Sequence, residues 1–201
     1  MNLTYRIAIN LFKIFYGIGP KPQIIGSRKL PKDQSFIVVS NHISNYDPPF
    51  LTTLLNRKIN FMAKDNLFKN KFGSFILKKL GAFPIKRGSF DRSAIKYALE
   101  LLKNNQILGI FPEGTRSTDG QLQQPQLGAT MLALKSKSPI IPIGIKGTDS
   151  PFKENITANI GEMFTLDEFY DKKLSKEEMK EAGSVIMNKI KELLEKEEDS
   201  N

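Results

Sequence analysis

The chain contains no cysteine and no tryptophan, and it has one histidine among its 201 residues. The absence of cysteine excludes disulfides, thiolate metal sites and a cysteine nucleophile. One histidine without cysteine also leaves too few ligands for a zinc site, so we predict neither a metal nor a bound cofactor. His42 is therefore the side chain that titrates near neutral pH without perturbation, and acid–base chemistry in this protein is expected to use it.

A long apolar run is missing as well. Residues 2–18 predict a helix whose largely apolar surface is broken by one narrow polar stripe. This helix is too short and too charged to span a bilayer, which takes about 20 mostly apolar residues, and no small-residue cleavage site follows it. A helix lying in the membrane interface fits best, with packing on the core or on a partner subunit as the alternative. We assign an amphipathic membrane-binding segment to residues 1–22 and one globular domain to residues 23–201.

Positive charge is concentrated in the first half of the chain. Residues 1–90 contain 15 lysines and arginines against 3 acidic residues, whereas residues 91–201 contain 15 against 18. A basic half indicates an anionic partner: a nucleic acid, a phospholipid surface or a phosphorylated substrate. General solubility is the simpler explanation of the same numbers. The lysine-rich and aromatic stretch at residues 64–80 is either a second membrane contact or an ordinary amphipathic helix with its lysines in water.

Short apolar segments alternate with helical patterns along the chain. This alternation predicts a single α/β domain with a mostly parallel central sheet flanked by helices. Ligands of such sheets bind at the loops that follow the carboxyl ends of the strands. Strands are expected at residues 36–39, 59–63, 107–111, 140–145 and 156–160, and a short strand or turn at 81–87. Helices are expected at 48–55, 64–80, 91–103, 126–137 and 175–198, and an edge segment or loop at 23–34.

Two polar motifs directly follow predicted strands. Residues 41–47 read NHISNYD, and residues 111–117 read FPEGTRS. In the first motif, Asp47 lies five positions after His42 with a turn between, so its carboxylate can orient the imidazole and stabilise its charge. Asp47 is also expected to be the N-cap of a helix whose first residue is Pro48. Both motifs lie where an α/β sheet places its ligands.

Two further segments complete a pattern. Residues 81–87 read GAFPIKR, and residues 139–143 read PIIPI. In their order and separations the four segments resemble the conserved blocks of the glycerolipid acyltransferase superfamily, in particular its 1-acylglycerol-3-phosphate O-acyltransferases. The resemblance covers roughly residues 35–165 and makes residues 23–201 an acyltransferase domain.

The resemblance identifies His42 and Asp47 as the catalytic pair. Neutral His42 would take the proton of the acceptor hydroxyl as that hydroxyl attacks a thioester, and Asp47 would fix the tautomer of the ring and stabilise the imidazolium. Because the acceptor supplies the attacking oxygen, the protein needs no nucleophile of its own. Acylation of Ser44 is a minor alternative.

Six residues are predicted to bind substrate. The guanidinium of Arg87 matches the acceptor's phosphate, Lys86 assists as a point charge, and Arg116 is a second phosphate ligand. The resemblance implies an acceptor-binding role for Glu113, which is alternatively expected to hold Arg87 or Arg116 in place. Gly114 permits a close backbone approach and offers its N–H to an oxyanion. Thr115 lies in the same turn, where it is alternatively needed only to satisfy backbone groups. The full set is Lys86, Arg87, Glu113, Gly114, Thr115 and Arg116.

The resemblance implies transfer of a fatty acyl group to the sn-2 hydroxyl of lysophosphatidate, which gives phosphatidate for phospholipid synthesis. The donor would be a thioester of acyl carrier protein or coenzyme A, a co-substrate and not a cofactor. The expected partners are these substrates and an anionic phospholipid membrane, with no nucleic acid. The protein is expected at the cytoplasmic face of the cell membrane, bound there as a peripheral, monotopic protein. The alternatives are another acceptor, such as glycerol 3-phosphate or another lysophospholipid, and a non-catalytic membrane-binding protein.

Overall fold

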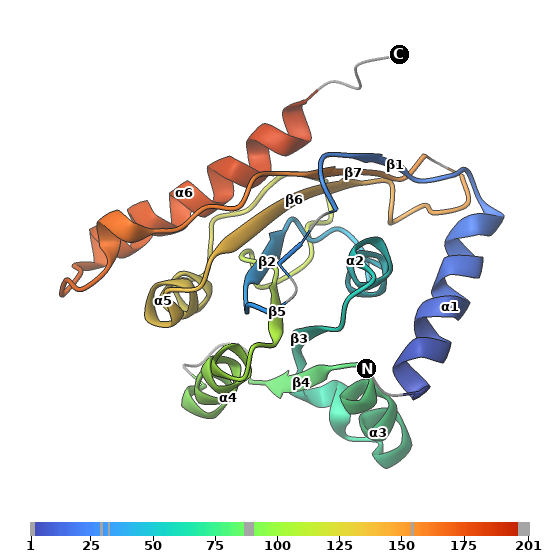
Figure 1. Ribbon diagram of the computed structural model, residues 1–201, viewed down its shortest axis with the longest axis horizontal. Coiled ribbons are helices and arrows are strands. Elements are labelled where there is room, and N and C mark those ends of the chain that lie inside the picture. The colour runs from blue at the N-terminus through green and yellow to red at the C-terminus, as the bar shows by residue number, and fades with distance from the viewer. Residues whose placement is uncertain (1–2, 29, 32, 87–90, 154, 197–201) are drawn as a thin grey trace.

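One seven-stranded sheet forms the centre of the molecule (Figure 1). The structure is a computed structural model, and it describes residues 3–28, 30, 31, 33–86, 91–153 and 155–196. The strands are β1 (Gln23–Ile25), β2 (Ile37–Ser40), β3 (Ile59–Lys64), β4 (Ala82–Ile85), β5 (Ile107–Ile110), β6 (Ile140–Lys146) and β7 (Thr157–Ile160). They lie in the order β1-β7-β6-β2-β5-β3-β4. The five strands from β6 to β4 run parallel, and β7 is antiparallel to β6.

Helices cover both faces of this sheet (Figure 1). One face packs against α4 (Arg92–Lys103), α5 (Leu127–Ser136) and α6 (Lys176–Glu195), and the other against α1 (Leu3–Ile18) and α2 (Asp47–Leu55). The remaining helices are α3 (Lys71–Lys79) and two short 3-10 helices, η1 (Asp65–Phe68) and η2 (Asp167–Phe169). Within the described ranges, none of the helices combines the length and apolar character that a membrane crossing requires.

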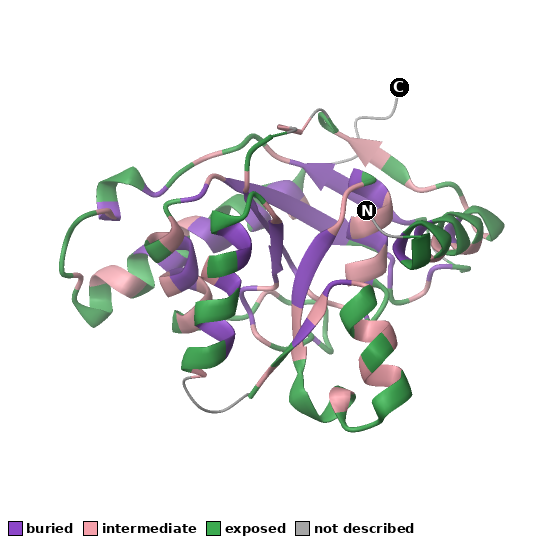
Figure 2. Cartoon of the chain, turned by 60° about the horizontal axis from the view of Figure 1, so that its bottom comes forward, coloured by how far each residue is buried: buried purple, intermediate pink, exposed green. Residues whose placement is uncertain are grey.

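The central strands are apolar on both faces because both faces are covered by helices. In β2, Ile37 and Val39 belong to the core beneath α4, α5 and α6, whereas Val38, and Phe36 just before the strand, belong to the core beneath α1 and α2. Every residue of β2 and β5 is buried, and Figure 2 shows the strands as purple ribbons inside a greener shell of helices. These strands therefore occur in the sequence as continuous apolar runs, which explains why the sequence predicted them.

The α/β class predicted from the sequence is confirmed, and two local predictions are wrong. Asp47 is the first residue of α2 and not its N-cap; Tyr46 holds the capping position without a side-chain hydrogen bond. Residues 64–80 are not one helix, because the extended backbone of Asn70 separates η1 from α3. The Asn70 side chain then accepts a hydrogen bond from Gly73 N and caps α3. The segment at 23–34 contributes β1, an edge strand that pairs with β7 in parallel.

The strand order brings three chain segments together at one edge of the sheet. Strand β2 lies between β6 and β5, and Val39 is in register with Pro142 on one side and Ile110 on the other. Because the three strands are parallel, the loops after all of them leave from the same edge. The polar motif at 41–47 follows β2, and the polar motif at 111–117 follows β5.

The close pairing of β3 and β5 gives a test of this packing. Gly109 of β5 is in register with Phe61 of β3, and a Cβ atom at Gly109 would lie 2.2 Å from Cε1 of the Phe61 ring. We expect Gly109→Ala to lower the unfolding free energy by about 1–3 kcal/mol, because the buried ring must move. Gly128→Ala in α5 is the control, since its Cβ would meet no atom within 4 Å and alanine favours helix. Thermal denaturation measures both variants. If Gly109→Ala is as stable as Gly128→Ala, the close packing of β3 against β5 is contradicted.

Candidate active site

His42 and Asp47 form a hydrogen-bonded pair at the carboxyl edge of the sheet. His42 lies in the turn after β2, and its Nδ1 atom is 2.7 Å from Oδ2 of Asp47. The Asp47 side chain is fully buried and the His42 side chain is 12% exposed. A carboxylate only accepts hydrogen bonds, so Nδ1 carries the proton and Nε2 of the neutral ring is left to accept one. This is the orientation that a general base requires.

The turn between the two residues closes on the carboxylate of Asp47. Oδ2 also accepts hydrogen bonds from the backbone N–H groups of Ile43 and Ser44, each at 2.8 Å. The sequence positions Asp47 in the first turn of α2, where the helix dipole also favours a negative charge. Asp47 therefore does not cap α2: its Oδ2 is occupied by the turn that carries His42, and its Oδ1 accepts from the hydroxyl of Thr148.

Glu113 holds the backbone of His42 from the neighbouring loop. Its Oε1 accepts a hydrogen bond from the backbone N–H of His42 at 2.9 Å, and its Oε2 accepts one from Gln123 N at 3.0 Å. The backbone N–H of Ser117 donates to the carbonyl oxygen of His42 at 2.8 Å. Both backbone groups of His42 are thus fixed by the loop after β5, and burial raises the pKa of Glu113 above its ordinary value.

This position corrects one prediction about Glu113. The carboxylate is 1% exposed and both of its oxygen atoms accept backbone hydrogen bonds. Among the described residues it forms no ion pair with Arg116, so the expectation that it holds Arg116 in place is wrong. The geometry assigns Glu113 to the support of His42, and its buried oxygen atoms do not face solvent where a substrate would arrive.

An aromatic stack sets the plane of the His42 ring. The imidazole lies on the ring of Phe111, with centroids 4.0 Å apart and planes 15° from parallel. Phe111 in turn stacks on Phe61 at 5.6 Å and 13°. With Nδ1 fixed by Asp47 and one ring face covered by Phe111, the imidazole has little freedom to rotate. The sequence analysis assigned no role to Phe111 or Phe61, because an aromatic residue next to a strand is usually part of the core.

A cavity of about 440 Å³ lies beside the pair. Thr115 and Arg116 are exposed and contribute to its lining, as does Ile43, the residue after His42. The backbone N–H of Gly114 donates to the carbonyl of Phe111 at 3.0 Å, so it is already used within its turn. The positive φ of 71° at Gly114 explains why glycine occurs there, but the predicted oxyanion role of its N–H is not available in this geometry.

Lys86 lies at the same edge of the sheet but further along it. It follows β4, which is separated from β5 by β3, and its backbone N–H donates to Asp91 at 3.0 Å. Its side chain is exposed. Arg87, the predicted phosphate ligand, lies outside the described residues. The structure thus brings His42, Asp47 and Glu113 into direct contact, lines the adjacent cavity with Thr115 and Arg116, and leaves Lys86 at the far strand.

The arrangement supplies an acid–base group and no nucleophile of its own. Ser44, two residues after His42, is buried, and its Oγ accepts a hydrogen bond from Tyr46 N at 3.1 Å inside the turn. In the ranges that the structure describes, no three histidine, cysteine or acidic residues gather as metal ligands. The site is therefore suited to removing a proton from a bound hydroxyl group, which then attacks a second substrate.

Comparisons with known proteins agree with this geometry. A family model described as Acyltransferase matches residues 21–146. The 1-acyl-sn-glycerol-3-phosphate acyltransferase of Bacillus subtilis is 34% identical over 148 residues, which is 73% of this chain and 73% of that protein. The protein of the same name from Borreliella burgdorferi is 30% identical over 71% of this chain, although the match spans only 58% of its own length.

A solved structure extends the comparison to the fold. The crystal structure of the 1-acyl-sn-glycerophosphate (LPA) acyltransferase PlsC from Thermotoga maritima superposes with a TM-score of 0.71. The match covers 96% of this chain and 81% of the other, at 25% sequence identity. The similarity therefore includes the sheet and both polar motifs, and not merely one conserved segment.

Burial of Glu113 has a consequence for stability. Because its pKa is raised in the folded protein, the stability that this group contributes is complete below its ordinary pKa and is lost as pH rises through the folded pKa. We expect the unfolding free energy of the wild type, minus that of Glu113→Gln, to fall as pH increases from 4.5 to 8. Urea denaturation of both proteins across this range measures the difference, since other titrating groups largely cancel. A difference that is constant or rises with pH would contradict the assigned burial.

Proposed function

The chain belongs to the acyltransferase family, and from this membership we propose that it transfers a fatty acyl group to the sn-2 hydroxyl of 1-acylglycerol 3-phosphate, giving phosphatidate. The acyl donor is a thioester of acyl carrier protein or of coenzyme A. The observation that supports the chemistry most directly is the His42–Asp47 pair, whose Nδ1–Oδ2 contact leaves Nε2 to accept a proton, with a cavity lined by the next residue, Ile43. The names of the relatives in two bacteria support the choice of lysophosphatidate as acceptor.

In the proposed reaction His42 is first a base and then an acid. Nε2 takes the proton of the acceptor hydroxyl as its oxygen attacks the thioester carbonyl, and Asp47 stabilises the imidazolium that results. The tetrahedral intermediate then collapses: the new ester C–O bond stays, the C–S bond breaks, and the imidazolium returns its proton to the leaving thiolate. No acyl-enzyme forms, which agrees with the buried position of Ser44 inside the turn.

Basic residues at the carboxyl edge are the proposed ligands of the acceptor's phosphate. Arg116 and Thr115 line the cavity next to Ile43, and a guanidinium binds phosphate with two parallel hydrogen bonds. Lys86 follows β4 at the same edge of the sheet and adds positive charge, and Arg87, outside the described residues, is the next residue in the sequence. We propose that these side chains, together with the backbone turn at Gly114, bind the phosphate while the sn-2 hydroxyl reaches His42.

We further propose that residues 1–22 bind the membrane through α1. One face of this helix, which includes Tyr5, Ile9 and Tyr16, is buried against the domain. A second apolar row remains exposed, and its members recur every three or four positions, so they form one stripe along the helix. These residues are Leu3, Ile7, Leu11, Ile14 and Ile18, each 52–72% exposed. The helix next to the N label in Figure 2 is accordingly green over most of its surface.

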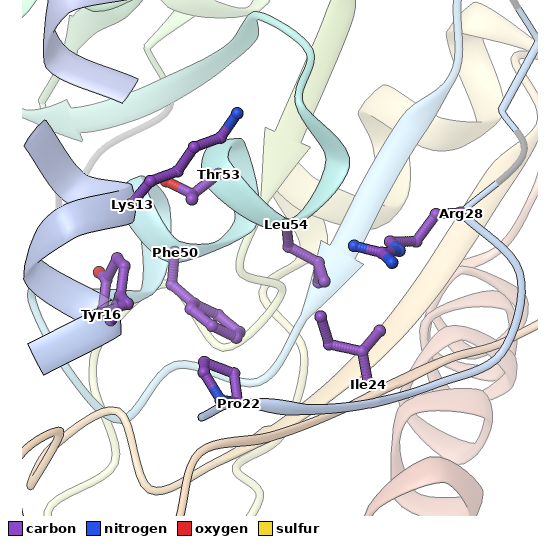
Figure 3. A pocket seen from close by; sticks show the side chains of 9 residues that line it. Lys13, Tyr16, Pro22, Ile24, Arg28, Phe50, Thr53 and Leu54 are labelled. Atoms are coloured by element: carbon purple, nitrogen blue, oxygen red, sulfur yellow. The ribbon is translucent and has the colours of Figure 1, made fainter. Parts of the chain in front are cut away.

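Positive side chains elsewhere on the surface support an anionic bilayer as the partner. Lys13 of α1 and Arg28 lie at the edge of a cavity of about 230 Å³ whose floor is apolar, with Phe50, Leu54 and Ile24 beneath them (Figure 3). On α3, Phe72 and Phe75 are also exposed among lysines. Apolar insertion combined with about 1 kcal/mol for each basic residue near an anionic surface is sufficient for peripheral binding. The proposed location is the cytoplasmic face of the cell membrane.

The reaction is tested with purified protein, lysophosphatidate and either acyl thioester on anionic vesicles. We expect wild type to form phosphatidate and His42→Ala to lose at least about 100-fold in kcat, because positioned acid–base catalysis typically contributes 100- to 10,000-fold. Asp47→Asn should also lower kcat. Mass spectrometry of the product identifies the acceptor when glycerol 3-phosphate and lysophosphatidylcholine are offered in parallel. Equal product from wild type and His42→Ala would remove His42 from the mechanism, and product from glycerol 3-phosphate alone would replace the acceptor.

Membrane binding is tested on the exposed stripe alone. We expect Leu11→Glu combined with Ile14→Glu to reduce co-sedimentation with anionic vesicles at least several-fold, because two charges replace side chains that would insert among lipids. Both positions point away from the domain, so thermal stability should be retained. The matched control is Leu127→Glu, an exposed leucine of α5. Equal retention of the double variant and the control would exclude this face of α1 as the membrane contact.

A further inference from the structure

A third chain segment reaches the candidate active site from strand β6. Thr148 follows this strand at the edge shared with β2 and β5, and its side chain is fully buried. The Thr148 hydroxyl donates a hydrogen bond to Oδ1 of Asp47, which lies 101 residues earlier in the chain. We propose that Thr148 is a positioning residue, which holds the Asp47 carboxylate so that its other oxygen faces His42. The proposal rests on the function assigned above to His42 and Asp47.

The two oxygen atoms of Asp47 are held by different donors. Oδ2 accepts from Nδ1 of His42 and from the backbone N–H groups of Ile43 and Ser44. Oδ1 has the hydroxyl of Thr148 as its one donor among the described residues. Because the carboxylate is completely buried, water does not replace a missing donor there. Thr148 thus fixes the carboxylate from the side opposite His42, together with the donors to Oδ2.

The end of β6 at Ile145, three residues before Thr148, is held by the residue that precedes His42. The side-chain amide of Asn41 donates to the carbonyl of Ile145 and accepts from its N–H, both at 2.8 Å, so it ties the end of β6 to the end of β2. The chain then turns at Gly147, where φ is +78° and a Cβ would lie 2.5 Å from the carbonyl oxygen of Asn155. A side chain at position 147 would disturb this turn, which is the turn that aims Thr148 at Asp47.

The other ionisable groups around the pair are few and have separate partners. Glu113 faces His42 from the loop after β5, where its two oxygen atoms accept backbone hydrogen bonds. Tyr16 approaches from α1, but its hydroxyl donates to the carbonyl of Tyr46 at 2.8 Å, and burial raises its pKa so that it stays neutral. Asp149 is exposed and lines the cavity with Arg116. None of these groups supplies Oδ1 of Asp47 with a donor.

Loss of the Thr148 hydroxyl therefore has an effect beyond stability. In Thr148→Val the shape of the side chain is kept, but Oδ1 is left buried without a donor. The negative charge of Asp47 is then less neutralised, so the protonated form of His42 is stabilised more strongly. We expect kcat to fall about 10-fold, the acidic limb of its pH profile to move to higher pH, and the KM values of both substrates to stay within about 2-fold. Thr148→Ser restores the hydroxyl and should recover most of kcat.

The test compares Thr148→Val, Thr148→Ser and Thr130→Val, which removes the hydroxyl of an equally buried threonine in α5. His42 is the chain's one histidine, so ¹⁵N-labelled histidine gives a single imidazole whose titration NMR follows without substrate. We expect His42 to titrate at higher pH in Thr148→Val than in wild type, and at the wild-type pH in Thr148→Ser and Thr130→Val. Equal titration and equal pH profiles in all four proteins, with only stability changed, would overturn the proposal. If the wild-type protein shows no acyl transfer, the proposed function is refuted instead. The NMR comparison of His42 still decides the role of Thr148 in that case.

Discussion

The buried negative charge of Asp47 is the constraint on which the rest of the site depends. An ionised carboxylate inside a protein is strongly unfavourable unless donors surround it. Here the donors come from the turn after β2 and from the residue after β6. Collecting them in one place requires these two strands to be neighbours and parallel, with their carboxyl ends level. The strand order β6-β2-β5 satisfies that requirement and also brings Glu113 to the backbone of His42. The contacts of the His42–Asp47 pair therefore depend directly on the strand order of the sheet.

The sequence was sufficient to predict the parts that depend on local pattern. Continuous apolar runs identified the buried strands, and the spacing of His42 and Asp47 was short enough for one turn to join them, which the 2.7 Å contact agrees with. The role of Glu113 was harder to predict, because its partners are the backbone groups of His42 and Gln123. Almost every residue has a backbone N–H, so a hydrogen bond to one cannot be recognised from the sequence. The sequence therefore suggested an ion pair of Glu113 with Arg87 or Arg116; the described residues show none with Arg116, and Arg87 lies outside them.

Thr148 and Phe111 were missed for a different reason. A threonine after a strand and a phenylalanine at the end of one are ordinary residues for an α/β protein, and each becomes part of the site only when β6, β2 and β5 are placed side by side. Contacts between residues 101 positions apart depend on strand order, which local periodicity does not encode. The available signal was weak: Gly147 before Thr148, and Gly109 opposite the ring of Phe61, both mark places where the backbone must approach another segment closely.

Helix α1 connects the surface of the molecule to this site. A helix with two apolar faces is unfavourable in water, because only one of them can be buried against its own domain. The inner face of α1 meets the catalytic turn directly: Tyr16 donates to the carbonyl of Tyr46, the residue before Asp47, and Phe15 stacks on the Tyr46 ring. If the outer face lies among lipids, the turn that holds His42 and Asp47 is then one helix diameter, about 10–12 Å, from the bilayer interface. A lysophospholipid acceptor whose chain stays in the membrane can present its hydroxyl at that distance.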